Sequence, residues 1–146
     1  CFSTGLGAPV GSVLVGSRAR IEVAHRWRKV LGGGMRQAGV LAAACLYALE
    51  HNVERLAEDH ENAAHLAAGL AQIDEVTVQS QATNMVFAQL PQEHCKPLEA
   101  RLKARGILTQ MLYSSRFVTH RDVLRSDIDV FVAALKAYFC APAFRE

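Results

Sequence analysis

The stretch that decides the fold is glycine-rich and lies near the N-terminus; it reads Ser3-Thr4-Gly5-Leu6-Gly7-Ala8-Pro9-Val10-Gly11-Ser12. Its glycines permit positive φ angles and a close approach of the backbone to a ligand or to another chain. Pro9 fixes its own φ and removes a donor, so a regular strand cannot resume before Val10. An apolar run at 12–15 follows. The pattern predicts a strand end, a tight turn and a second strand, together forming a shelf on which a cofactor could lie.

Three helices are predicted after this shelf. Ser17 is placed to cap a helix over 18–31, whose apolar stripe of Ile21, Ala24, Trp27 and Leu31 we expect to be buried. The three glycines at 32–34 end it. A second, alanine-rich helix covers about 35–49. The third and longest covers about 53–72, and we expect His60 on its apolar stripe as a hydrogen-bonded core histidine.

The second half of the chain alternates between strand and helix patterns. Strands are predicted at 76–78, 84–88, 107–109 and 116–118. A helix begins near Pro97 and ends at Gly106, and the pattern Ser126-x-x-Asp129 predicts a capping box that opens the last helix. This order predicts an α+β domain with helices on one face of a small, largely antiparallel sheet.

Composition excludes several classes of protein. The 146 residues are 51% hydrophobic and 21% charged, which is ordinary for a globular protein. No apolar run is long enough to span a membrane. The four cysteines are widely spaced, and we expect free thiols and a cytoplasmic location. No His-x-x-x-His pair exists, so no metal site is expected. Because the first residue is Cys1, we expect the chain to be a fragment of something longer.

The basic residues gather between Arg18 and Arg36, where six of them face the single acid Glu22. The net charge of the chain is only +2. Because Trp27 belongs to the predicted apolar stripe, this segment is better interpreted as a helix with a buried face than as a nucleic-acid surface. No nucleic-acid partner is expected.

Several uncommon strings resemble the low-specificity L-threonine aldolases, which are pyridoxal-phosphate (PLP) enzymes of the aspartate-aminotransferase fold type. The resemblance rests on the glycine-rich stretch and on strings that follow it in the same order: Arg26-Trp27-Arg28-Lys29, Gly32-Gly33-Gly34-Met35-Arg36-Gln37, Glu58-Asp59-His60-Glu61-Asn62-Ala63, Thr83-Asn84-Met85 and Arg116-Phe117-Val118-Thr119-His120. The resemblance runs over the whole chain and implies an α/β fold, the C-terminal part of a PLP-dependent transferase-like fold. Residues 1–50 would then be a remnant of the PLP-binding large domain, and 51–146 a connecting helix and a small α+β domain.

The resemblance also implies a reaction and a set of site residues. Family members cleave L-threonine or allo-threonine, small amino-acid substrates, to glycine and acetaldehyde. Lys29 and Arg36 match family positions near the cofactor, where cations suit a phosphate dianion. Arg116 matches the arginine that grips the substrate carboxylate, a task suited to the planar guanidinium group.

One substitution decides the expected chemistry. The family carries PLP as a Schiff base on a lysine between the Ser and Gly of the first string, and this chain has Thr4 there. A hydroxyl can neither form an imine nor exchange it with a substrate amine. We therefore expect a lyase relative without aldolase activity, a pseudoenzyme with no catalytic residue of its own, and doubtful PLP binding. Two alternatives stay open: a non-enzymatic module that self-associates or joins a full-length paralogue, and the product of a decayed gene.

Overall fold

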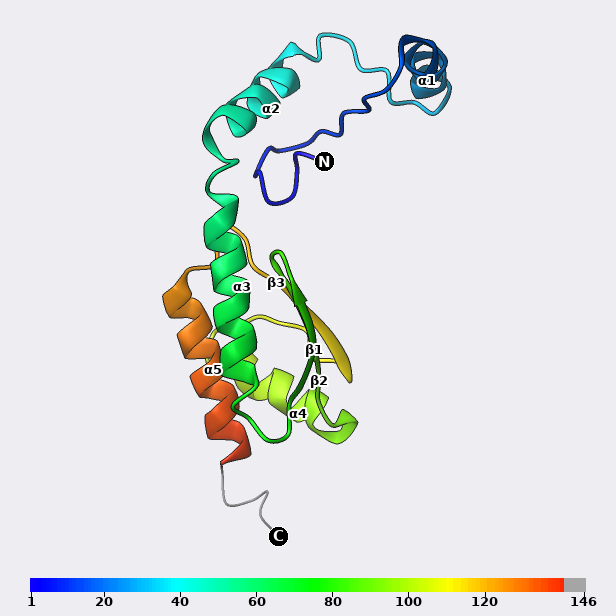
Figure 1. Ribbon diagram of the computed structural model, residues 1–146. Coiled ribbons are helices and arrows are strands. Elements are labelled where there is room, and N and C mark those ends of the chain that lie inside the picture. The colour runs from blue at the N-terminus through cyan, green and yellow to red at the C-terminus, as the bar shows by residue number, and fades with distance from the viewer. Residues whose placement is uncertain (141–146) are drawn as a thin grey trace. The chain divides into compact units, whose positions relative to one another are not determined.

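The structure, a computed structural model, describes residues 1–140 and divides into two compact units, Cys1–Arg55 and Leu56–Glu146. Unit 1 holds two helices and unit 2 holds three helices and a three-stranded sheet (Figure 1). The expected α/β fold class is confirmed.

Unit 1 consists of a closed loop followed by α1 (Arg18–Val30) and α2 (Gly39–His51). As predicted, α1 ends at the glycine run. Gly32 has a φ of 80°, and the amides of Gly32 and Gly33 donate to the carbonyls of Lys29 and Arg28 at 3.1 and 2.8 Å. A residue in the left-handed region closes a helix C-terminus in this way, and glycine takes that conformation without steric cost.

Two expectations for unit 1 were wrong. Residues 12–15 form no strand, and Val13, Leu14 and Val15 are 63–83% exposed. A strand needs a neighbour to pair its backbone groups, and unit 1 offers none along this run. The expected buried stripe of α1 is also exposed: none of the thirteen residues of α1 is buried, and Trp27 is 57% exposed. Helical spacing identifies an apolar stripe but not the surface that covers it.

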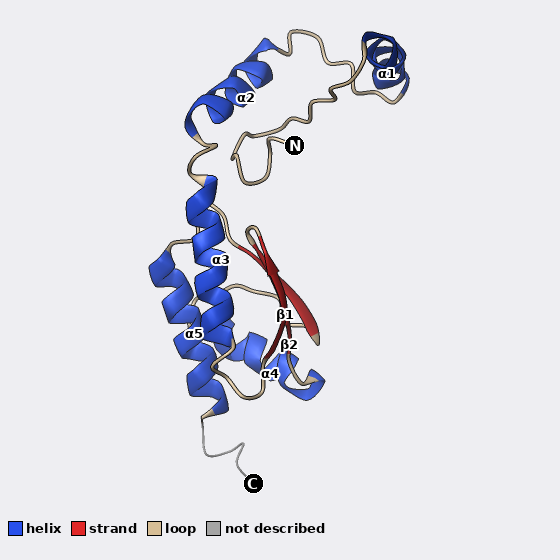
Figure 2. Cartoon of the chain, in the orientation of Figure 1, coloured by secondary structure: helices blue, strands red, loops and turns tan. Residues whose placement is uncertain are grey.

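Unit 2 follows the predicted order of helices and strands except that the strand predicted at 107–109 is not formed (Figure 2). Its elements are α3 (Leu56–Leu70), β1 (Thr77–Ala82), β2 (Met85–Gln89), α4 (Gln92–Lys103), β3 (Ser114–Val118) and α5 (Arg125–Phe139). The sheet has the order β1-β2-β3, and both strand pairs are antiparallel. Helices α3 and α5 lie side by side, and α3 contacts β1 and β2. The predicted α+β arrangement with a small antiparallel sheet is therefore present.

The core of unit 2 lies between the sheet and its helices. Alternate residues of β2, Val86 and Ala88, are fully buried on the helix side. Leu70 from α3, Leu98 from α4 and Leu135 from α5 are also fully buried. The one-sided burial agrees with the alternation of an antiparallel sheet that packs on one face only.

Four details of unit 2 differ from the prediction. Residues 107–109 have no regular structure, so within residues 1–140 no strand pairs with the outer side of β3. Helix α4 begins at Gln92, directly after Pro91, and contains Pro97 in its interior rather than near its start. The other two differences concern α3 and the start of α5.

His60 is exposed and its neighbour Asp59 is buried, so the apolar stripe of α3 is rotated from the predicted one. The buried Thr119 hydroxyl donates to the Asp59 carbonyl at 2.6 Å, which ties α3 to the end of β3. At α5, the carboxylate of Asp127 accepts from the Leu124 amide at 2.9 Å. Asp129, expected in the capping box, instead contacts His65 of α3.

We predict that Leu135→Ala lowers the free energy of unfolding by about 2–5 kcal/mol, because it leaves a cavity in the core of unit 2. Val130→Ala is the matched control on the same helix; Val130 is 59% exposed, and its truncation changes stability by less than about 0.5 kcal/mol. Urea unfolding of the whole chain, followed by far-UV circular dichroism, measures both. Equal effects of the two substitutions would show that α5 does not pack as described.

Candidate functional site

The glycine-rich stretch closes into a loop that packs on α2. The amide of Phe2 donates to the Gly11 carbonyl at 2.8 Å, and the amide of Ala8 donates to the Phe2 carbonyl at 2.9 Å. Gly11 has a φ of 135°, and a Cβ there would lie 2.7 Å from Cys45 Sγ. Only glycine fits both the conformation and the space. The sequence thus dictates a rigid loop at this position.

Thr4 lies at a turn of this loop. Its carbonyl accepts from the Gly7 amide at 2.9 Å, and Gly7 has a φ of 71°. The Thr4 side chain is exposed. The loop therefore presents a hydroxyl where the resemblance places an amine, and that hydroxyl can hydrogen-bond a ligand but cannot condense with an aldehyde.

Lys29 and Arg36 lie on either side of the glycine run of unit 1. Lys29 is in the last turn of α1, and its Nζ donates to the Gly34 carbonyl at 3.3 Å. Arg36 lies three residues before α2 and is exposed. Both side chains are exposed cations, and Arg36 also lies near the N-terminus of α2, where an anion is favoured. Lys29 is folded back on the glycine run, so it would have to exchange the Gly34 carbonyl for a ligand.

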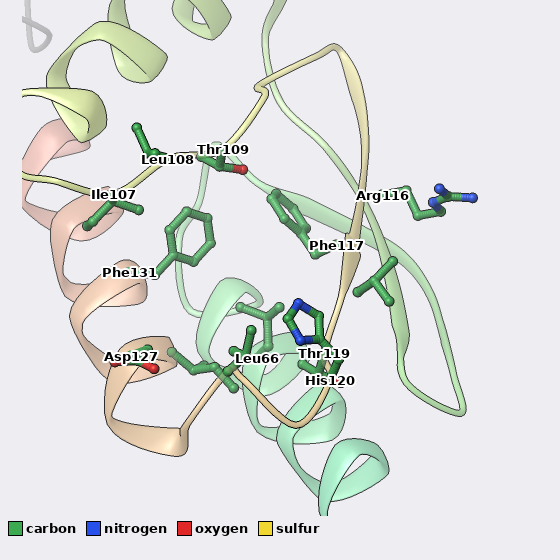
Figure 3. A pocket seen from close by; sticks show the side chains of 13 residues that line it. Leu66, Ile107, Leu108, Thr109, Arg116, Phe117, Thr119, His120, Asp127 and Phe131 are labelled. Carbon is green, nitrogen blue, oxygen red and sulfur yellow. The ribbon is translucent and has the colours of Figure 1, made fainter. Parts of the chain in front are cut away.

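Arg116 belongs to unit 2 and lies in the middle of β3, directly across from Phe87 of β2. Its side chain is exposed and lies on the side of β3 opposite Phe117 (Figure 3). Among residues 1–140 no carboxylate forms an ion pair with it. The guanidinium group is therefore available to a carboxylate from outside the described residues. Because it lies on unit 2, the structure does not place it relative to Lys29 and Arg36.

A cavity of about 380 Å³ lies on the other side of β3. It is an open hollow lined by β3, the segment 107–109, the first half of α5 and Leu66 of α3 (Figure 3). Its walls are mainly apolar, and the rings of Phe117 and Phe131 contact each other there, with their centroids 5.4 Å apart. Thr109, His120 and Asp127 add polar groups. No motif in the sequence predicts this cavity, because it forms only where β3, α5 and the segment 107–109 pack together and where Leu66 of α3 joins them.

A polar cluster between α3 and α5 was also missed. His65 Nε2 lies 2.6 Å from Asp129 Oδ1, and Arg125 Nη2 lies 3.2 Å from His65 Nδ1. Because a guanidinium only donates, Nδ1 accepts and Nε2 donates to the carboxylate. The cluster joins the two helices, and no spacing within either helix signals it.

The cysteines are free, as expected, and Cys95 is an unsuitable nucleophile. Burial raises the pKa of the Cys95 thiol, and the nearby Glu93 carboxylate adds to the rise. Cys1 and Cys140 are exposed. Within residues 1–140, no three His, Cys, Asp or Glu side chains gather in a way that could hold a metal ion. None of the helices in that range has the length and apolar character needed to cross a membrane.

Comparison with known proteins shows a consistent likeness. A sequence model of the family described as beta-eliminating lyase matches residues 1–93. The low specificity L-threonine aldolase of Escherichia coli K12 is 48% identical over 138 residues, which cover 94% of this chain and 41% of that protein. A probable low-specificity L-threonine aldolase of Arabidopsis thaliana is 45% identical over 141 residues, covering 89% of this chain and 38% of its own length. The chain thus spans about two fifths of the length of these relatives.

The fold agrees with this likeness. A crystal structure of a beta-eliminating lyase/threonine aldolase-type protein from Exiguobacterium matches with a TM-score of 0.76 at 20% identity. The match covers 94% of this chain and 43% of that one.

We predict that iodoacetamide at neutral pH modifies Cys1 and Cys140 and leaves Cys95 unmodified in the folded chain. Cys95 is 2% exposed, and its raised pKa leaves less of the reactive thiolate at any given pH. Peptide mass mapping with and without urea is the measurement, and urea should make Cys95 reactive. Rapid modification of Cys95 in the folded chain would contradict the packing of α4.

Proposed function

Because the chain belongs to the beta-eliminating lyase family, we propose that it is a threonine aldolase-like chain that keeps anion-binding side chains but lacks the amine on which the family's chemistry depends. The single observation that carries this proposal is Thr4, exposed on the rigid turn of the glycine-rich loop. The family reaction would be the cleavage of L-threonine or allo-threonine to glycine and acetaldehyde.

The residues present do not fit PLP as a covalently held cofactor. The family's cofactor carries an aldehyde and a phosphate dianion. The phosphate could be met by the two cations of unit 1, Lys29 and Arg36. The aldehyde requires a neutral amine on the loop, and the hydroxyl of Thr4 cannot supply an imine. Lys29 is the nearest amine in sequence to the glycine run, and it is engaged with the Gly34 carbonyl.

In this proposal Arg116 keeps the family role of holding a substrate carboxylate. Its guanidinium group is exposed on β3, and Phe87 lies directly across from it. A planar, permanently charged fork binds a carboxylate through two parallel hydrogen bonds. Binding of this kind needs no lysine, so anion recognition can persist in a chain that does not catalyse the reaction.

The first test is trapping of PLP on the chain. PLP is mixed with the purified chain and with a Thr4→Lys variant, borohydride reduces any imine, and peptide mass mapping locates the label. We expect no stoichiometric label on the unmodified chain, because it lacks the loop amine. Specific labelling of the unmodified chain at Lys29 would overturn the proposal.

The Thr4→Lys variant carries the second arm of this test. Its labelling at residue 4 would mean that one substitution separates this chain from a PLP-binding site. A Ser3→Lys variant is the matched control, since it adds an amine to the same loop one position away. Equal labelling of both variants would mean that the amine reacts as any exposed lysine does.

A second function, association with another chain, is favoured by the exposed apolar surface of unit 1. Val23, Trp27 and Val30 of α1 and Val40 and Tyr47 of α2 are each 57–71% exposed. Exposed apolar surface on this scale is typical of protein interaction sites. The partner in this proposal is a second copy or an intact threonine aldolase whose site Lys29 and Arg36 would complete.

We predict that the tagged chain co-purifies with an intact threonine aldolase and that Arg36→Ala weakens this association. Arg20→Ala is the matched control, because it removes an arginine from α1 without touching the glycine run. Retention of the partner is measured by quantitative gel analysis after equal washes. Loss of co-purification with both variants, or with neither, would argue against a role for Arg36 in a shared site.

A further inference from the structure

The outer edge of β3 carries backbone groups that no described residue pairs. The amide of Thr119 donates to the Asn84 carbonyl at 2.9 Å, and the amide of Leu90 donates to the Tyr113 carbonyl at 3.0 Å. In an antiparallel pair, alternate residues direct their backbone groups to the same side. Ser115 and Phe117 therefore face β2 with Tyr113 and Thr119.

Ser114, Arg116 and Val118 consequently direct their N–H and C=O groups away from β2. Within residues 1–140 no backbone group bonds to them on that side. The segment 107–109, which the sequence predicts as a strand, lies near β3 without pairing to it. The edge is therefore open along the whole of β3.

The cavity of about 380 Å³ adjoins this edge. Its lining includes Phe117 of β3, Thr119 directly after β3 and Phe131 of α5 (Figure 3). A volume of this size falls within the range of pockets that hold ligand side chains or small molecules. The open edge and the cavity are two independent observations at one place.

We infer that β3 binds an extended peptide as a fourth, edge-paired strand. In an extended peptide successive side chains point to opposite faces. Apolar side chains on one face would enter the cavity beside Phe117 and Phe131. The peptide residue between these two apolar residues would pair with Arg116, and its side chain would lie on the same face of the sheet as the Arg116 side chain. Since Arg116 has no acidic partner among the described residues, the complementary residue is acidic.

The partner is thus a protein segment with the alternation apolar–acidic–apolar in extended conformation. Backbone hydrogen bonds to Ser114, Arg116 and Val118 supply affinity, and the cavity and Arg116 supply selectivity, as in other strand-addition complexes. This inference does not depend on PLP, but it uses Arg116, which the proposed function assigns to a substrate carboxylate. The Val118→Pro variant described below leaves Arg116 in place, so it tests strand addition separately from the proposed function.

The test uses the full chain and a fluorescein-labelled peptide Thr-Val-Glu-Val-Thr, with binding read from fluorescence anisotropy. The control peptide Thr-Val-Lys-Val-Thr differs only in the charge that meets Arg116. We expect the glutamate peptide to bind more tightly and to shift the amide NMR signals of Ser114, Arg116 and Val118. Absence of binding up to about 1 mM peptide, where even a weak contact is detectable, would overturn the inference.

Val118→Pro tests whether the peptide bonds to the outer backbone edge of β3. Proline at 118 removes an N–H donor that faces away from β2, so the hydrogen bonds between β2 and β3 stay intact. We expect peptide affinity to fall about tenfold, which is the effect of losing one hydrogen bond to the peptide. Far-UV circular dichroism verifies the fold of this variant. Phe117→Pro is the matched control, because it removes an inward donor and is expected to disrupt the sheet itself. Unchanged affinity in a folded Val118→Pro chain would contradict strand addition.

Arg116→Glu provides a second variant that does not disturb the backbone. Reversed preference, with the lysine peptide now binding more tightly than the glutamate peptide, is the expected result. Preference for the glutamate peptide in this variant would show that the peptide does not lie across from residue 116, and the inference would fail.

Discussion

The close packing of α3 against α5 over the small sheet is the interaction on which the fold of unit 2 depends. A Cβ at Gly69 of α3 would lie 2.9 Å from the Cγ2 methyl of Val132 in α5, so the missing side chain allows the two helices to approach. The Thr119 hydroxyl then joins β3 to the Asp59 carbonyl of α3. These contacts hold β3 with its apolar side toward the helices and Arg116 toward the open face.

Unit 1 depends on a different constraint. Its loop is closed by backbone hydrogen bonds and by Gly11, which has no room for a side chain. Its helices nevertheless bury almost nothing: Ala48 is the single buried residue of α2, and α1 has none. Burial of apolar surface is the main favourable term in folding. The order of unit 1 therefore comes chiefly from local backbone geometry, and its apolar residues remain available to another surface.

The sequence predicted local features well because their causes are local. The glycine run that ends α1, the strand β2 and the strand that carries Arg116 all follow from spacing and backbone chemistry within a few residues. The burial of Trp27 and the strand at 12–15 were wrong because both need a covering or pairing partner that local spacing cannot reveal. His60 was misplaced for a related reason, since several rotations of the alanine-rich α3 would each present an apolar stripe.

The candidate site divides in the same way. Thr4, Lys29, Arg36 and Arg116 could be singled out only through the resemblance of whole strings to a family, and the structure adds their exposure and their contacts. The contact between His65 and Asp129 joins segments distant in sequence. The cavity behind β3 depends on how neighbouring segments pack, and no motif predicts either feature. Resemblance to a family therefore identifies the candidate site residues, whereas the packing of the chain determines which of them are exposed and what they contact.

The central proposal is that this chain binds the anionic groups of the family's cofactor and substrate, a phosphate and a carboxylate, without catalysing the family's reaction. Acetaldehyde release from L-threonine and L-allo-threonine, measured with the purified chain and PLP against PLP alone, tests that claim most directly. The account predicts equal rates with and without the chain. A rate that rises in proportion to the concentration of the chain and favours one stereoisomer would contradict it.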